Sequence, residues 1–329
     1  MTSPSAFFPI LKMANRLLMS GNPHCQWSDI VRRVVCLSLF FFSHAFALTV
    51  KHDLGETEIP NIPQRVVALD WVSTETLLSL GITPFAIADT DGYRHWVAFP
   101  ALPDTVKDVG SRREPNLESI TALKPDLIVI NEAHAAVYPA LAKIAPTVAF
   151  NVFNGEKKPL KALRTMTVTV GSIFGKEDVS HDVINAAQHI FQQNNAKLHE
   201  AGMANLPLVV IRFIGNTHVR IHGEGSLAND IVVELGLRNS WQEKTNNWGF
   251  SSSGIEALAK HQQATVVYLE SLDDAQRKAI FSTPLWKAMR FSRENNVIAL
   301  PPIWTFGGLI SAQRMSNEIT ANLIGNAEK

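Results

Sequence analysis

Cysteine is scarce in this chain, and both copies lie near the N-terminus. Cys25 and Cys36 precede residue 48, so the rest of the chain can form no disulfide and has no thiol chemistry. No apolar stretch approaches the roughly 20 residues that a membrane-spanning helix needs. Signatures of common enzymes are also missing, namely G-x-S-x-G, the P-loop, the dinucleotide fingerprint and H-E-x-x-H. The sequence therefore favours a binding protein over an enzyme.

The N-terminal segment has the pattern of a secretory signal. Arg32-Arg33 precedes the uncharged run VVCLSLFFF at residues 34–42, and Ala45-Phe46-Ala47 follows it. A basic region, a short apolar core and an A-x-A exit are typical of such signals. We expect residues 1–47 to be a signal peptide that is cleaved near Ala47; the alternatives are a buried helix or a membrane anchor.

The balance of charge argues against a nucleic-acid partner. Residues 1–47 hold four of the 30 basic residues and one of the 30 acidic residues, so 26 and 29 remain in residues 48–329. A nucleic-acid-binding surface normally shows a clear basic excess. The mature chain is slightly acidic instead.

Short β-branched runs alternate with longer helical patterns in two sets. The runs occupy residues 65–69, 85–88, 126–130 and 147–150, and then 208–213, 264–269 and 296–300. Strands separated by helices predict α/β layers with mainly parallel pairing. Between the sets, apolar residues recur at helical spacing from Leu160 to Glu200, which predicts a long helix broken near Gly175.

This organisation predicts two α/β lobes joined by a helix. We expect an N-terminal lobe at residues 48–158, a connecting helix at 159–178 and a C-terminal lobe at 179–329. The halves also resemble each other, because Glu118 and Glu256 each open a helix about ten residues before a strand.

Several aromatic and basic side chains stand in loops rather than in apolar stripes. Trp71 follows the first strand, and Trp96, Trp248 and Trp304 lie in polar or turn-rich segments. Tryptophan in such loops can line a cleft between α/β lobes, although each could also anchor a loop. Arg112 and Arg113 share the loop DVGSRREPNLE, and a guanidinium offers a fixed fork of donors to clustered oxygens.

Histidines are scattered, which favours surface positions over the alternative of a protein-bound metal. His218 and His222 lie four residues apart on a predicted strand, on one face but too far apart for a tight pair. Any metal is therefore expected to arrive already chelated, as part of the ligand, and no cofactor is expected.

The chain resembles the periplasmic ferric-hydroxamate, or ferrichrome-type, siderophore-binding proteins, whose two lobes are joined by one long helix. The resemblance runs from RVVALDW to LPPIWTFGG and includes ADTDGYRHWV, DVGSRREPNLE, NSWQEKTNNWG and STPLWKAM. It implies a monomeric periplasmic solute-binding protein that is no enzyme. The implied role is to capture an iron(III)–hydroxamate siderophore and to deliver it to the membrane permease of an ABC importer.

The resemblance also implies a set of site residues. Arg112 takes the position of an arginine that bonds the hydroxamate oxygens, and the cleft aromatics correspond to Trp71, Trp96, Trp248, Trp304 and Phe306. His134 stands where a ligand-contacting tyrosine is expected, and Phe306 stands where an aromatic hydroxyl is expected. Acidic residues on the two lobes dock on the importer, and Glu118 and Glu256 are the candidates.

Two other function classes stay open at this point. The same architecture could carry cobalamin, haem or a catecholate siderophore; haem would use His134 or another histidine, and a catecholate would need further cations such as Arg94 and Arg113. A two-lobed α/β transferase also binds its substrate between lobes.

Overall fold

A computed structural model describes residues 48–269 and 272–327. The predicted signal peptide, with Cys25 and Cys36, lies outside the described residues. The described residues form one compact unit, so the proposed lobe boundaries stay a prediction.

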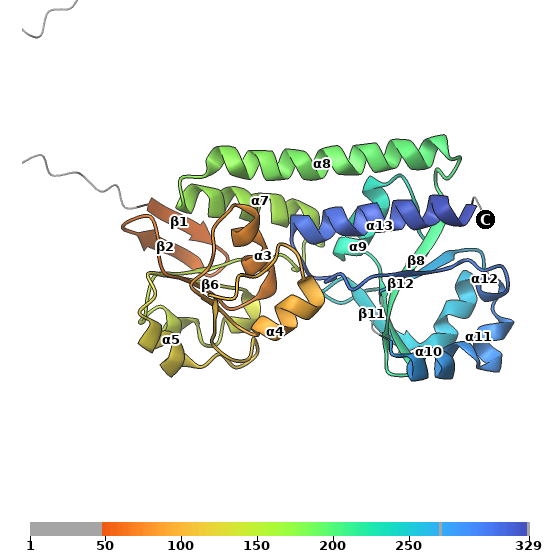
Figure 1. Cartoon of the computed structure of the whole chain (residues 1–329), viewed down its shortest axis with the longest axis horizontal. Coiled ribbons are helices and arrows are strands. Elements are labelled where there is room, and N and C mark those ends of the chain that lie inside the picture. Colours follow the sequence, from red (N-terminus) through yellow and green to blue (C-terminus); the bar gives the residue numbers. More distant parts are fainter. Residues whose placement is uncertain (1–47, 270–271, 328–329) are drawn as a thin grey trace, which may run out of the picture. The chain divides into compact units, whose positions relative to one another are not determined.

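The N-terminal half is built on a five-stranded parallel sheet (Figure 1). Its strands lie in the order β5-β4-β3-β6-β7, and their bounds are β3 Val66–Ala68, β4 Ala86–Ile87, β5 Lys107–Asp108, β6 Leu127–Ile130 and β7 Thr147–Ala149. The residues of the central strands β3, β4 and β6 are all buried, as expected for strands covered on both faces.

Short helices and a hairpin complete this half. Its connections are α3 Trp71–Ser79, α4 Thr90–Gly92, a π turn at Tyr93–Val97, α5 Leu117–Leu123, a 3-10 turn at Glu132–His134 and α6 Tyr138–Leu141. The hairpin of β1 (Leu48–His52) and β2 (Gly55–Ile59) precedes the sheet.

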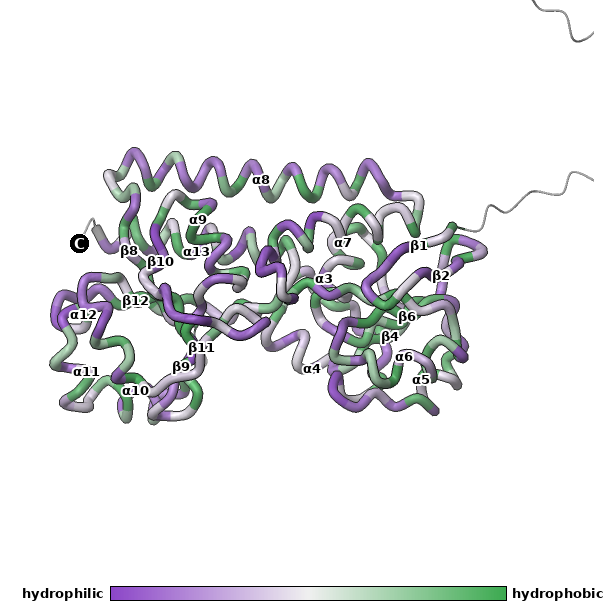
Figure 2. Tube along the Cα trace, turned by 180° about the vertical axis from the view of Figure 1, so that it is seen from behind, coloured by the Kyte–Doolittle hydropathy of each residue, from purple (hydrophilic) through white to green (hydrophobic). Residues whose placement is uncertain are grey.

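Two helices follow the first sheet, and the predicted helix break near Gly175 is confirmed. Helix α7 spans Pro159–Ile173 and α8 spans Glu177–Glu200, with Gly175 at a φ of 61° between them. Helix α7 thus ends five residues before the predicted end of the connecting helix at 178. Figure 2 shows hydrophilic and hydrophobic residues alternating along α8, the pattern of a helix with one buried face.

The β-branched tract in α7 is helical because its threonines bond within the helix. Thr167 Oγ1 donates to Leu163 O at 2.8 Å, and Thr169 Oγ1 donates to Thr165 O at 3.0 Å. Threonine can bond the carbonyl one turn earlier in this way. The packing of α7 on α8 needs Gly171, since a Cβ there would lie 2.7 Å from Ser180 Cβ.

The C-terminal half contains a six-stranded mixed sheet. Strands β8, β12 and β13 pair in parallel, as do β8 and β10, whereas β9 is antiparallel to both β8 and β11. The bounds are β8 Pro207–Ile214, β9 His218–His222, β10 Arg238–Asn239, β11 Phe250–Gly254, β12 Thr265–Leu269 and β13 Val297–Leu300. The α/β class with mainly parallel sheets is confirmed, but the antiparallel edge of this sheet was not predicted.

Helices pack around the second sheet, and the last one reaches back to the first half. They are α9 Leu227–Glu234, a 3-10 helix at Ile255–His261, α10 Asp274–Phe281, α11 Pro284–Ala288, α12 Arg290–Arg293 and α13 Leu309–Ala327. Helix α13 runs alongside α8 (Figure 1).

One buried carboxylate joins α3 of the first half to the start of α13. Glu75 has no exposed surface, and its oxygens accept from Gly308 N at 2.9 Å, Ser311 N at 2.7 Å and Ser311 Oγ at 2.6 Å. The first N–H groups of a helix lack partners within the helix, and the positive end of the helix dipole favours an anion there. Burial raises the pKa of Glu75, while these hydrogen bonds oppose the rise.

The glycine pair of the motif WTFGG makes this contact possible. A Cβ on Gly307 would lie 2.2 Å from Ser311 Oγ and 2.8 Å from Glu75 Oε2. Arg314 adds a second link, because its guanidinium donates to Val97 O and to Pro302 O. The two halves are therefore joined through buried polar contacts besides the helices.

We predict that Glu75→Ala destabilises the fold by at least about 2 kcal/mol, because each N–H left unpaired in the interior costs about 1–3 kcal/mol. Thermal unfolding followed by circular dichroism should show a midpoint several degrees lower. Glu118→Ala, on the exposed start of α5, is the control and should change little. A midpoint for Glu75→Ala equal to that of the control would contradict the role of this contact.

Candidate functional site

A cavity of about 390 Å³ lies between the two halves. From the first half, its walls come from the segments that follow the carboxyl ends of β3, β6 and β7 and from the loop of Arg112. Ligands of parallel α/β sheets bind at this edge. From the second half, the walls come from β9, β11 and the segments around Trp248 and Trp304. The lining residues are Asp70, Trp71, Val72, Arg112, Arg113, Asn131, Glu132, Ala133, His134, Phe150, Asn151, Val152, Phe153, Arg220, Trp248, Phe250, Trp304 and Phe306.

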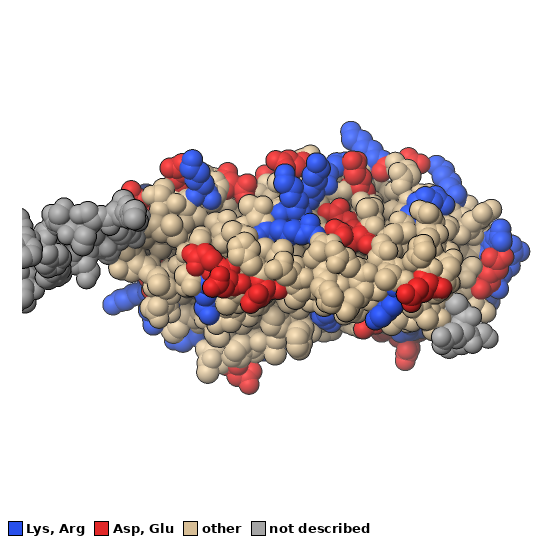
Figure 3. All heavy atoms as spheres, turned by 90° about the horizontal axis from the view of Figure 1, so that it is seen from above, with Lys and Arg blue, Asp and Glu red and all other residues tan. Residues whose placement is uncertain are grey.

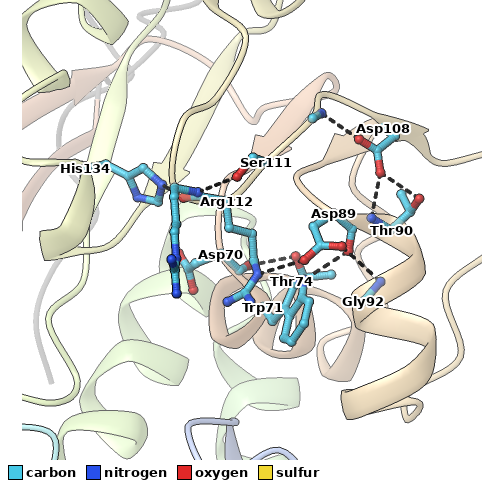
Figure 4. Close-up of polar contacts among 12 residues, drawn as sticks. Asp70, Trp71, Thr74, Asp89, Thr90, Gly92, Asp108, Ser111, Arg112 and His134 are labelled. Atoms are coloured by element: carbon cyan, nitrogen blue, oxygen red, sulfur yellow. Dashed lines mark hydrogen bonds and ion pairs between the residues drawn. The ribbon is translucent and has the colours of Figure 1, made fainter.

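The guanidinium of Arg112 is held in place from two sides (Figure 4). Its Cζ atom lies 3.4 Å from the centre of the Trp71 ring, and its Nε lies 3.2 Å from Asp89 Oδ2. Trp71 and Asp89 are themselves linked, because Trp71 Nε1 donates to Asp89 O at 3.1 Å. The stacked and paired arginine is thus positioned before any ligand binds.

Asp89 owes its position to local turn chemistry. It has a φ of 61°, and its side chain accepts from Gly92 N at 3.0 Å to cap α4. Asp and Asn tolerate this left-handed conformation better than most residues. The next residue, Thr90, donates from its backbone N and its Oγ1 to Asp108 Oδ2 at 2.7 Å.

Arg112 keeps free hydrogen-bond donors. Within the described residues, its side chain donates only from Nε, to Asp89, and a guanidinium carries five N–H groups. The four N–H groups on the two terminal nitrogens remain for a ligand. The side chain is 31% exposed, so a ligand can reach it from the cavity.

His134 supports the backbone of Arg112. Its Nε2 lies 2.8 Å from Arg112 O, and since a carbonyl only accepts, Nε2 carries the proton and donates. The residue is 2% exposed, and its Nδ1 has no partner among the described residues. Asp70 lines the cavity nearby; burial raises its pKa, although hydrogen bonds from Ser73 and the charges of His134 and Arg112 oppose the rise.

Aromatic rings form a continuous wall around the cavity. Trp71 meets Trp304 with ring centres 4.8 Å apart, and Trp304 meets Phe306 at 5.4 Å. Phe306 in turn meets Trp248 at 5.2 Å, and Trp248 stacks on Phe153 at 5.7 Å. Trp248 is 40% exposed, so part of its indole ring is accessible to a ligand.

Six of the seven ligand-binding residues predicted from the sequence line this cavity, and Trp96 does not. The six are Trp71, Arg112, His134, Trp248, Trp304 and Phe306. Trp96 is half-buried next to them, with its ring centre 6.5 Å from that of Trp304. The docking candidates Glu118 and Glu256 are both exposed, in the first turns of α5 and of the 3-10 helix at Ile255–His261.

Sequence reasoning missed Phe153, Phe250 and Arg220 in the cavity wall. Phe153 closely follows the run TVAF, and Phe250 follows Trp248-Gly249. Both could therefore have been predicted from their closeness in sequence to the expected cleft segments. Arg220 lies inside a predicted strand, where only the pairing of β9 shows which face it occupies.

His222 lies buried behind the aromatic wall, next to Phe250 and Phe306, with ring centres 6.3 and 6.4 Å away. Neither ring nitrogen has a partner among the described residues. Burial, together with the charges of Arg220 and Arg212, lowers its pKa to about 3. His222 therefore stays neutral and acts as part of the aromatic packing.

A search of protein-family models matches residues 66–303 to the family described as periplasmic binding protein. The chain belongs to this family. It is 34% identical to the iron(3+)-hydroxamate-binding protein FhuD of Escherichia coli over 263 residues, which cover 80% of this chain and 88% of that protein.

Solved structures of family members have the same fold. The siderophore-binding protein FhuD of Vibrio cholerae, crystallised with Fe3+ and Desferal, matches with a TM-score of 0.75 and 32% identity, covering 79% of this chain and 97% of that one. The catecholate-siderophore-binding protein VctP of Vibrio cholerae matches with a TM-score of 0.67 at 20% identity, covering 84% and 99%, which shows a shared fold.

The residues that the structure describes offer neither a membrane-spanning helix nor a cluster of metal ligands. They contain no helix with the length and apolarity needed to cross a membrane. They also contain no group of three or more His, Cys, Asp or Glu side chains placed to hold a metal ion.

We predict that His222 makes the protein sensitive to acid. The unfolded chain takes up a proton at His222 below pH 6.5, whereas the folded protein does so only near pH 3. The contribution of His222 to the free energy of unfolding is therefore complete above pH 6.5. It falls as the pH drops, by about 2 kcal/mol between pH 7 and pH 5.

Urea unfolding at pH 7 and pH 5 measures this loss, and His222→Phe should reduce the loss by that amount because phenylalanine cannot titrate. His189→Phe, a change at an exposed histidine on α8, is the control. An unchanged loss in His222→Phe would contradict the prediction.

Proposed function

We propose that this protein captures iron(III)–hydroxamate siderophores in the cavity and delivers them to the membrane permease of an ABC importer for iron uptake. The observation that carries the proposal is the Arg112 side chain, stacked on Trp71 with free donors beside an aromatic-walled cavity. The relatives named for iron–hydroxamate and Desferal complexes support this ligand class.

The chemistry of the cavity suits such a chelate. Its oxygens around the metal accept hydrogen bonds, and charge-assisted bonds to Arg112 contribute about 1.5–3 kcal/mol. Its apolar periphery packs on the rings, which contributes roughly 25 cal/mol per Å² of buried apolar area. Aromatic walls discriminate weakly among similar hydrocarbon backbones, so we expect more than one hydroxamate siderophore to bind.

We assign ligand contact to the full predicted set, namely Trp71, Trp96, Arg112, His134, Trp248, Trp304 and Phe306. For His134 the contact is secondary to its hydrogen bond to Arg112 O. Trp96 does not line the cavity, and its ring centre lies 6.5 Å from that of Trp304, so its contact with the ligand would be at the cavity edge. Iron belongs to the ligand and is no resident cofactor, and we propose no catalytic reaction.

The remaining assignments concern location and assembly. We propose export to the periplasm with cleavage near Ala47, and action as a monomer. In Figure 3, basic and acidic side chains are interspersed on the face shown, and neither sign covers it. This distribution agrees with a partner that is not a nucleic acid.

We predict that Arg112→Gln weakens binding of ferric ferrichrome about tenfold to a hundredfold, because the charge-assisted bonds are lost. Titration followed by quenching of tryptophan fluorescence measures the affinity. Arg94→Gln is the matched control, since Arg94 pairs with Asp104 away from the cavity. Unchanged affinity in Arg112→Gln would remove this arginine from the site.

We predict that Glu118 and Glu256 dock the protein on the permease through opposite charges. The double charge reversal Glu118→Arg and Glu256→Arg should lower siderophore-dependent iron uptake in cells at least tenfold, while the affinity of the purified protein for ferric ferrichrome stays unchanged. Reversal of the exposed Glu200, at the end of α8, is the control. Normal uptake by the double variant would exclude these two residues from docking.

A further inference from the structure

Two arginines lie side by side on neighbouring strands of the second sheet, next to the cavity. Arg212 on β8 pairs directly with Arg220 on β9 in the antiparallel ladder. Side chains at such opposed positions lie on one face of the sheet, about 5 Å apart at Cβ, and like charges there destabilise the pair. His222 lies on the same face because it follows Arg220 by two residues on β9. Phe250 of β11 pairs with His222 and so shares this face.

No acidic side chain offsets this pair. Within the described residues, no ion pair involves Arg212 or Arg220, whereas Arg112 has Asp89 as its partner. The charged groups that line the cavity are Arg112, Arg113, Arg220, Asp70 and Glu132. Asp70 is buried and bonded to Ser73, so the charge that a ligand meets in the cavity is mainly positive.

The two arginines are held by aromatic rings. Arg220 Cζ lies 4.8 Å from the centre of the Phe250 ring, and Arg212 Cζ lies 4.2 Å from that of Trp96 and 5.8 Å from that of Trp304. Arg212 Nε is buried without a partner. Cation–π contacts fix the guanidinium groups but leave their hydrogen bonds unsatisfied.

A partly buried cation without an acidic partner is costly unless an anion binds to it. The structure assigns Arg220, with Arg212 beside it, to an anion-binding subsite that takes a carboxylate arm of the ferric hydroxamate ligand. This inference rests on the proposed function. It places the iron-wrapping oxygens at Arg112 on one wall of the cavity and the carboxylate at Arg220 on the opposite half.

Charge counting supports a carboxylate-bearing ligand. Three hydroxamates carry three negative charges and neutralise iron(III), so a plain trihydroxamate core brings no net charge into the cavity. A chelate with an additional carboxylate is anionic and matches the unpaired arginines. The preferred ligand class is therefore the hydroxamate siderophores that also contain carboxylates.

A matched ligand series tests this inference with one iron-binding core. The ferric complexes of desferrioxamine B, its N-acetyl form and its N-succinyl form share the same trihydroxamate and end in an ammonium, a neutral amide and a carboxylate. The wild-type protein should bind the succinyl complex about tenfold more tightly than the acetyl complex. The ammonium complex should bind most weakly.

Variants locate the effect. Arg220→Gln should bring the ratio of succinyl to acetyl affinity close to one, and Arg220→Lys should keep most of the preference. Arg212→Gln should lower the same ratio, and it serves as the test if Arg220→Gln does not fold. Arg113→Gln is the control, since Arg113 is exposed at the cavity and should lower the ratio less.

Three results would overturn the inference: equal binding of the succinyl and acetyl complexes by the wild type, an unchanged ratio in Arg220→Gln, or an equal loss in Arg113→Gln. Failure of the proposed function is distinguishable from these. In that case no member of the series would quench the tryptophan fluorescence of the wild-type protein.

Discussion

The hydrogen bonds of the buried Glu75 carboxylate to Gly308 and Ser311 join the two halves of the chain and so set the shape of the cavity between them. The cavity takes its walls from both halves of the chain, so its shape depends on how the halves are joined. Glu75 fixes α3, which begins with Trp71, to the start of α13, only a few residues after Trp304. Because breaking these bonds would leave buried donors and a buried carboxyl group without partners, we expect the halves to move little when a ligand binds.

Arg112 is held in place before a ligand binds, as part of a preformed cavity. Its guanidinium is already stacked and paired, and His134 holds its backbone, so little conformational entropy is lost on binding. The aromatic wall supplies apolar area, and the arginine supplies orientation. We then expect the choice among hydroxamate ligands to depend on Arg220 and Arg212, which provide positive charge on the half opposite Arg112.

The sequence predicted the α/β class, both strand sets and the helix break near Gly175, because apolar runs and glycine are local signals. Trp71, Trp248, Trp304 and Arg112 were singled out by their places in loops, and the family resemblance added His134 and Phe306. Trp96 has the same kind of loop position but does not line the cavity, because a loop position does not determine where a ring points. Contacts between distant positions had no local signal. Glu75 lies 233 residues from Gly308, and nothing in its helix marks it as an interface residue. The pairing of Arg212 with Arg220 likewise depends on strand register, which the alternation of residues alone did not fix.

The central claim is a cavity formed in advance, with Arg112 directed at the oxygens around iron. A crystal structure of residues 48–329 with ferric ferrioxamine B tests it most directly. The account predicts the chelate between Trp248 and Trp304, hydroxamate oxygens within hydrogen-bond distance of the Arg112 terminal nitrogens, and Glu75 still bonded to Gly308 and Ser311. A chelate bound elsewhere, or halves rotated apart with the Glu75 contacts broken, would contradict it.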